Sequence, residues 1–474
     1  MIKSLILSIF FLVITTYRLQ SQQSNTLFFM HSVPQSNFIN PAIQGECRWF
    51  IGLPAISSTH FNLANNGFTV NHLLEHKEEG MDTLYAKEIV KKLTRRNYLS
   101  SELYTHLFAI GYKRKDLYFT FSIRERDDFI LFYPKDLFAF VFIGNTQYEG
   151  KWISLNGSGI QFNHFREYAI GVSKKYDYRT FGIRGKILFG KLNLNTRKSV
   201  IGLFTEENTF NLLFVNDILV NASLPYGLEV DTEGNYNITN EDYALELDLI
   251  LNRKNFGLGV DAGFIYNYDE NITISGSILD IGAIFYRSYL TNYDVEGNFS
   301  YTGPLGDTVP TENYFEDVIN TFTDGSIIGN RPYIYFLQPK ILIGASYKIN
   351  DKINLGGLIA SKIYRQKIQS GLILSANSRL ARYFSVNLSW SYIHRSFNNL
   401  GLGLAFGRMP LQFYIISDNV PGMIWLQSSK NINLRFGLNI IFGCFRKTGI
   451  KDCGCYWIRK EEERRERKYK LLNK

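Results

Sequence analysis

The sequence predicts an all-β protein, a transmembrane antiparallel up-and-down β-barrel of about 14 strands (12–16), with a short N-terminal helix or plug segment. Three observations predict it. Apolar and polar residues alternate along much of the chain, tight turns join the alternating segments, and short and long connections are sorted to opposite ends. In addition, an N-terminal leader sequence indicates that the chain is exported.

The stretch "NINLRFGLNIIFG", Asn431 to Gly443, carries the alternation. Its even positions are all apolar, namely Ile432, Leu434, Phe436, Leu438, Ile440 and Phe442, and the odd positions are polar or glycine except for Ile441. A soluble sandwich buries such an apolar face, whereas a membrane barrel turns it to lipid and lines its lumen with the polar face. We predict that the six even positions face lipid.

The first 21 residues are typical of a signal peptide. Lys3 precedes an apolar stretch from Leu5 to Ile14, and Leu19 and Ser21 stand at the −3 and −1 positions of a cleavage site before Gln22. About ten apolar residues are too few to span a bilayer as a helix, so removal is favoured over a retained anchor. The predicted organisation is a signal peptide over 1–21, an N-terminal segment with the first strand or strands and a short helix over 22–100, the barrel over 101–443, and a basic tail over 444–474.

Composition is consistent with a barrel and excludes helical membrane spans. Aromatic residues make up 15% of the chain, mean hydropathy is −0.12, and no run of 18 apolar residues follows the leader. Strands that cross a membrane are only half apolar, so these values still allow them. The predicted location is the outer membrane of a Gram-negative bacterium.

Fourteen segments are predicted as strands, and a short helix is predicted around 84–96. The strands lie near residues 104–113, 117–126, 169–176, 181–190, 242–251, 256–267, 272–286, 340–349, 353–364, 368–377, 384–395, 400–407, 411–417 and 431–442. The connections 268–271, 350–352, 378–383 and 408–410 are short and are assigned to the periplasmic side. The long connection 287–339 and the connection 418–430 then lie outside, as in outer-membrane barrels, although the outer links 365–367 and 396–399 are short too.

The sequence offers little that predicts catalysis. The seven histidines are scattered, and no nucleophile elbow, phosphate-binding loop or dinucleotide fingerprint occurs, so we expect no enzyme activity, no cofactor and no metal site. Cys444, Cys453 and Cys455 cluster after the last strand and could bind a metal or form a disulfide, but an incidental or redox-labile cluster is favoured. The basic tail is either a solvated extension or a docking element for anionic lipid headgroups or an acidic partner; nucleic acid is not expected as a partner.

Charged residues on the polar strand faces are candidates for the lumen. They are Asp261, Lys340, Lys348, Lys362 and Arg435. In a narrow barrel such groups pair with one another and fill the interior, which we favour, and in a wide barrel they tune selectivity. Near the N-terminus, Pro34 and Pro41 hold Val33 and Asn40 extended, so this segment either enters the barrel as a plug or leads to the first strand through the periplasm.

Three stretches resemble a family of uncharacterised outer-membrane barrels of Bacteroidetes-type bacteria. They are "FMHSVPQSNFINPAIQG" (Phe29–Gly45), "ISGSILDIGAIFY" (Ile274–Tyr286), and "LQFYIISDNV" (Leu411–Val420) with "KNINLRFGLNIIFG" (Lys430–Gly443). More distantly the chain is similar to the PorP/SprF proteins of type IX secretion and gliding and, in architecture, to FadL-like barrels. The resemblance implies no catalytic residues, and the tail with its cysteines departs from a family that usually ends at the last strand.

Three functions follow as expectations. The favoured one is a non-catalytic cell-envelope scaffold or a surface component associated with type IX secretion or gliding, in contact with outer-membrane lipid and with exported or surface proteins through the loop 287–339. The first alternative is a FadL-like channel for hydrophobic or small solutes. The second is a secreted soluble β-sandwich that binds other molecules.

Overall fold

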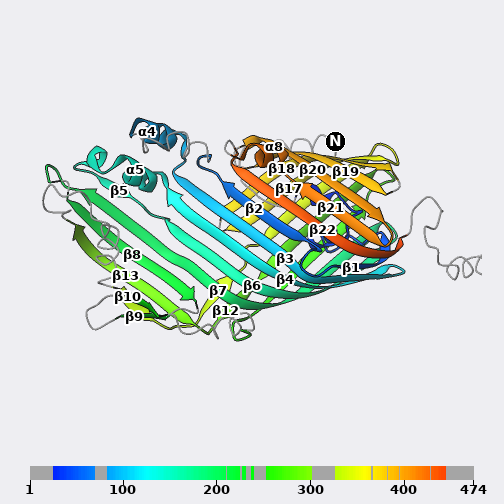
Figure 1. Ribbon diagram of the computed structural model, residues 1–474, viewed down its shortest axis with the longest axis horizontal. Helices are drawn as coiled ribbons and strands as arrows, with labels where there is room; N and C mark the ends of the chain where they lie inside the picture. Colours follow the sequence, from blue (N-terminus) through cyan, green and yellow to red (C-terminus); the bar gives the residue numbers. More distant parts are fainter. Residues whose placement is uncertain are drawn as a thin grey trace, which may run out of the picture.

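The computed structural model describes residues 25–69, 83–209, 211–224, 227–230, 236–239, 252–301, 326–364, 367–381, 383–393, 396–426 and 429–444. Within them, one antiparallel sheet of 14 wall strands forms a closed barrel (Figure 1). The predicted fold class and the predicted strand number are therefore confirmed.

Nine wall strands are single segments. They are β3 (Arg96–Arg114), β4 (Leu117–Pro134), β7 (Arg179–Thr205), β17 (Ile353–Tyr364), β18 (Lys367–Ala381), β19 (Phe384–Ile393), β20 (Ser396–Arg408), β21 (Leu411–Ser417) and β22 (Asn431–Cys444). The other five are interrupted, because the chain leaves the sheet and rejoins it: β1 (Cys47–Gly52) with β2 (Thr59–Asn65), β5 (Trp152–Ser154) with β6 (Gly159–Tyr176), β8 (Leu212–Ser223) with β11 (Phe256–Asn267), β12 (Ile272–Tyr286) with β13 (Leu290–Tyr301), and β14 (Ser326–Gly329) with β15 (Tyr333–Phe336) and β16 (Lys340–Lys348).

The barrel closes at β22, which pairs with β21 on one edge and with β1 and β2 on the other. Thr59 lies opposite Phe436, and Cys47 lies opposite Cys444. First and last wall strands are thus hydrogen-bonded neighbours, which leaves no open edge at this seam. A soluble sandwich of two sheets is ruled out by this closure.

The wall is higher on one side than on the other. β7 has 27 residues, whereas β21 has seven. In Figure 1, β6, β7, β8 and β13 continue well beyond the outer ends of β17 to β21. Connections at the opposite end, such as 115–116, 177–178 and 409–410, have two residues each. Short turns mark the periplasmic end of such barrels, so the high side of the wall points outward from the cell.

Apolar side chains cover the outside of the wall. Ile170 is 69% exposed, Leu388 is 58% exposed and Ile343 is 57% exposed, while the residues on either side of each of them in the strand are buried. Because a closed barrel satisfies its own backbone hydrogen bonds, it can place this apolar surface against lipid. The protein is an outer-membrane barrel of a Gram-negative bacterium.

Helices are few and short. The outer connections contain α4 (Thr83–Lys92), α5 (Lys135–Ile143), η2 (Thr146–Tyr148) and α8 (Val420–Ile424), and a separate hairpin joins β9 (Gly227–Val230) to β10 (Tyr236–Thr239). The N-terminal segment contains α2 (Asn25–Phe28) and η1 (Pro34–Phe38). Among the described residues no helix is long and apolar enough to cross a membrane.

One predicted feature differs from the structure. The connection 287–339 is not one long loop, because β13, β14 and β15 lie within it and extend the wall. The first strand or strands predicted within 22–100 are β1 and β2, which together make one wall strand. The predicted strand at 242–251 lies outside the described residues. The predicted helix at 84–96 corresponds to α4.

Candidate functional site: the plugged lumen

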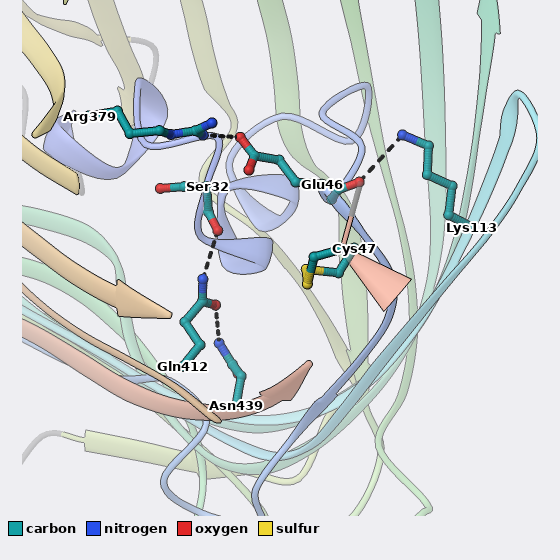
Figure 2. Close-up of a disulfide and its surroundings, with 9 residues drawn as sticks. Ser32, Glu46, Cys47, Lys113, Arg379, Gln412 and Asn439 are labelled. Carbon is teal, nitrogen blue, oxygen red and sulfur yellow. Dashed lines mark hydrogen bonds and ion pairs between the residues drawn. A yellow bond between two sulfur atoms is a disulfide. The ribbon is translucent and has the colours of Figure 1, made fainter. Parts of the chain in front are cut away.

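Residues 25–46, which we call the plug, run inside the barrel and contact strands all around it (Figure 2). The Thr26 hydroxyl lies 2.7 Å from the Ser389 hydroxyl on β19, and Arg184 on β7 donates to the Asn37 carbonyl at 2.8 Å. The sequence analysis left two courses open for this segment, entry into the barrel or a path through the periplasm. In the structure the segment enters the barrel. A lumen of 14 strands is wide enough to need such filling.

The plug begins at the outer end of the low wall. The Asp418 carboxylate, which follows β21, accepts hydrogen bonds from the backbone N–H groups of Asn25 and Thr26 at 3.1 and 2.8 Å. Burial raises the pKa of Asp418 above its ordinary value, and the two N–H donors oppose that rise. This carboxylate anchors the start of the plug.

Apolar side chains of the plug pack into three patches on the inner wall. Phe28 and Phe29 join Leu342, Leu358 and Ile373, as one cluster on β16, β17 and β18. A second cluster combines Leu27, Met30 and Val33 with Ala405, Tyr414 and Ile416, and a third places Phe38 against Phe50, Tyr118 and Ile441. The inner wall is therefore partly apolar, which differs from the uniformly polar lumen of a water-filled pore.

Glycines let the "NPA" stretch lie directly on the wall. Gly182 on β7 and Gly263 on β11 are register partners. A Cβ added at Gly182 would lie 2.2 Å from the Pro41 carbonyl oxygen, and one at Gly263 would lie 2.1 Å from Asn40 Oδ1. Only residues without a side chain fit at these two positions, so the wall is shaped to the plug.

The plug carries no ionised side chain before Glu46. Residues 25–45 include no Asp, Glu, Lys or Arg. Burial lowers the pKa of the remaining titratable group, His31, below its ordinary value, so its imidazole is neutral at pH 7. The plug is thus held by apolar contacts and by hydrogen bonds, and among the described residues its first ion pair is at Glu46.

The last residues of the plug are fastened to the wall near the periplasmic end (Figure 2). Glu46 forms an ion pair with Arg379 on β18, and Lys113 on β3 donates to the Gly45 carbonyl at 3.4 Å. Cys47 then forms a disulfide with Cys444, which joins β1 to β22 across the seam. The sequence did not indicate Cys47 as the partner of Cys444, which was grouped there with Cys453 and Cys455; these two cysteines lie outside the described residues.

Beyond the plug, ionised side chains cross the lumen in what we call the charge layer: Glu102, Arg124, Arg126, Glu167, Lys186, Asp261, Asp280, Lys340 and Lys362. Asp280 accepts from Arg126 at 2.8 Å and from Lys186 at 2.7 Å. Glu102 on β3 pairs with Lys362 on β17 at 2.6 Å, and these strands are not neighbours in the sheet. The ion pairs therefore tie opposite walls together.

The backbone at Asp280 is arranged for this layer. β12 bulges opposite Asp261, and Asp280 has a φ of 60°. Its N–H donates to Asp261 Oδ1 at 2.8 Å, while the same carboxylate lies 2.6 Å from Lys186 Nζ. A bulge changes the direction of a side chain relative to a regular strand, and here it brings the two carboxylates to one shared cation, Lys186.

An aromatic layer lies on the outer side of the charge layer. Tyr98, Ile130 and Tyr364 form one buried cluster, and Phe132 stacks on Tyr364 with ring centroids 4.7 Å apart. The cluster joins the outer ends of β3 and β4 to the outer end of β17. Plug, charge layer and aromatic layer thus follow one another along the lumen.

The structure places four of the five predicted lumen residues together. Asp261, Lys340, Lys362 and Arg435 are buried, and the first three belong to the charge layer, while Arg435 donates to the Ser58 hydroxyl at 3.4 Å. Lys348 lies apart, near the periplasmic turn, where it pairs with the exposed Asp351 at 2.5 Å. Sequence reasoning missed the other six residues of the charge layer: Glu102, Arg124, Arg126, Glu167, Lys186 and Asp280.

The missed residues left a partial signal. In "RTFGIRGKILFG" Arg184 and Lys186 alternate with Ile183 and Ile187. Arg126 in β4 has no such signal, because the charged residues Glu125 and Asp127 flank it. For Asp280 the sequence gives no signal, because its inward position depends on the bulge.

The six apolar positions of β22 lie on the outer surface. Ile432, Leu434, Phe436, Leu438 and Ile440 are half-buried and Phe442 is 45% exposed, whereas the alternating residues are buried inside the barrel. No group of three or more residues suited to hold a metal occurs among the described residues. His72, His76 and His394 lie outside them.

Comparisons with solved structures return outer-membrane barrels of low similarity. The crystal structure of the toluene transporter TodX of Pseudomonas putida has 8% identity and a TM-score of 0.36, with 85% of this chain and 92% of that chain covered. A Pseudomonas aeruginosa FadL homologue has 9% identity and a TM-score of 0.38, with 90% and 99% covered. At this level of similarity we transfer no function from them.

No curated protein matches the chain. A family model, described as a family of unknown function, DUF5723, matches residues 41–418. The match runs from the "NPA" stretch of the plug to the Asp418 that anchors its other end, and it covers most of the chain. The protein therefore belongs to the family of unknown function DUF5723.

Proposed function

We propose that the protein is a plugged outer-membrane channel for small hydrophobic or amphiphilic solutes, opened when the plug moves. The observation that carries the proposal is the division of contacts in the lumen. Ion pairs of the charge layer join wall to wall, whereas residues 25–45 of the plug are uncharged. Movement of these residues breaks no ion pair, so the wall can keep its shape while the plug leaves.

The class of solute follows from what the plug covers. Its departure uncovers the inner-wall patches around Leu342, Tyr414 and Tyr118. Sites for small molecules are mostly apolar with a few placed polar groups, and three apolar patches beside a charge layer fit that description. The proposal assigns no catalytic step and no cofactor to the barrel.

The test loosens the anchored start of the plug. Asp418→Ala removes the acceptor for two buried N–H groups, and Asp351→Ala removes an exposed carboxylate of the periplasmic turn as a matched control. In cells that carry each variant, uptake of an apolar fluorescent dye should be several-fold faster for Asp418→Ala than for wild type or the control. A polar dye of similar size reports general leakage.

A second readout follows the plug itself. Ser32→Cys, in a background with Cys453→Ser and Cys455→Ser, should react with a maleimide faster when Asp418 is replaced. If the plug becomes reactive and dye uptake does not change, the channel proposal fails.

A cell-envelope scaffold is the second candidate, and the aromatic and charge layers favour it. Both connect opposite walls, as in a barrel that is filled for rigidity. In this case the outer segments β13 and β14 would meet exported or surface proteins, in a role of the type IX secretion or gliding kind. Proteins that co-purify in mild detergent only when residues 287–339 are intact would support it.

A further inference from the structure

A cavity of about 40 Å³ lies between the plug and the charge layer. Phe38 and Ile39 of the plug form one side of it. Residues of β2, β3, β4, β7, β11, β12, β16 and β22, most of them charged, form the rest. The plug thus separates the cavity from the periplasmic end of the lumen.

Cations outnumber carboxylates around this cavity. Arg124, Arg126, Lys186, Lys340 and Arg435 line it. Three carboxylates face them, those of Glu102, Asp261 and Asp280. Arg435 also interacts electrostatically with the buried Asp418 carboxylate, so the other four cations leave an excess of one positive charge over the three carboxylates. That excess does not change when the ion-pair partners Glu167, Asp128, Arg184 and Lys362 are included. Excess charge of one sign in a buried site is costly unless a counter-ion joins it.

Buried nitrogen atoms at the cavity also lack acceptors. Arg126 is 4% exposed, and its Nε has no hydrogen-bond partner among the described residues; the same holds for Arg124 Nε. His60 is 4% exposed, and its Nδ1 also has no hydrogen-bond partner among the described residues. A guanidinium Nε–H can only donate, so the missing partner at the two arginines is an acceptor.

From these two observations we infer that the cavity is a binding site for a small monovalent anion of the size of chloride. An anion accepts the hydrogen bonds that the arginines offer and offsets the excess charge. The volume suits one monatomic ion or one to a few water molecules, since a water occupies about 30 Å³ in the liquid. A bulky carboxylic acid does not fit, so the site differs from a solute site, and the inference does not depend on transport.

The site also has a structural consequence. Because Phe38 and Ile39 close it, the anion sits where plug and walls meet and holds the cations of β4, β16 and β22 close together. Anion binding should therefore stabilise the plugged state and protect the plug from exchange with solvent.

The direct experiment uses the full-length protein in detergent, crystallised from sodium bromide in place of sodium chloride. A bromide anomalous peak inside the cavity, beside Arg126, is the expected result. Density at the cavity with no anomalous signal would mean that only water occupies it and would overturn the proposal.

A solution experiment tests the role of the charge excess. At constant ionic strength, replacement of gluconate by chloride should raise the unfolding midpoint of the wild type to a plateau. Lys340→Met removes one excess cation while Glu102 keeps its pair with Lys362, and it should abolish this response. Lys348→Met, a lumen-face lysine far from the cavity, should retain it. Equal responses in the two variants would count against the site.

Discussion

Ile441 is the one apolar residue on the polar face of β22, and the plug explains it. It is buried with Phe38 of the plug and with Phe50 and Tyr118 of the wall. A water-filled lumen would favour a polar residue there, as at Asn439 and Arg435. An exception to alternation in a barrel strand thus indicates where an internal segment packs.

At the scale of single residues, Asp261 forms ion pairs with two buried cations. Asp261→Asn removes the charge that holds Lys186 at 2.6 Å and Arg184 at 3.3 Å, and should lower the free energy of unfolding by about 3–5 kcal/mol. The same change at Asp351, whose side chain is 93% exposed, should cost less than about 1 kcal/mol. Urea unfolding in micelles measures both. Similar losses would show that the charge layer is solvated.

At the scale of elements, the regular hairpins of the second half were predictable because each strand alternates without interruption. The first wall strand was predicted only to lie within 22–100, without bounds, because β1 and β2 are separated by residues 53–58 and each is short. β7 extends beyond its predicted segment, 181–190, since a bulge near Lys191 shifts the alternation by one residue. A pattern of period two is lost wherever the backbone adds a residue.

The fit between plug and wall can be tested with substitutions at two glycines of β7, one that contacts the plug and one that does not. Gly182→Ala places a methyl group 2.2 Å from the Pro41 carbonyl oxygen, so the plug must shift. Gly185→Ala, on the same strand, meets nothing within 4 Å. Hydrogen exchange of peptides from residues 25–46 should speed up several-fold in the first variant and stay at the wild-type rate in the second. Unchanged exchange in both would show that the plug does not rest on β7.

At the scale of the whole molecule, the closed barrel was predictable but the content of its lumen was only partly so. Strand count, face assignment and membrane environment depend on local alternation, which a sequence shows directly. The partners in the lumen are distant along the chain: Glu102 and Lys362 are 260 residues apart, and Cys47 and Cys444 are 397 apart. Such pairs depend on the curvature of the sheet and on bulges such as the one at Asp280. Neither can be predicted from the sequence of a single strand.

The outward direction of the apolar face is the property on which the whole arrangement depends. Phe436 lies in the middle of β22 and is half-exposed on the outer surface. Phe436→Arg puts a cation against lipid near the bilayer midplane, which costs about 2–4 kcal/mol and should reduce the heat-modifiable folded form in outer-membrane fractions. Phe436→Leu keeps the surface apolar and should assemble like the wild type. Full assembly of the arginine variant would mean that this face of β22 does not meet hydrocarbon.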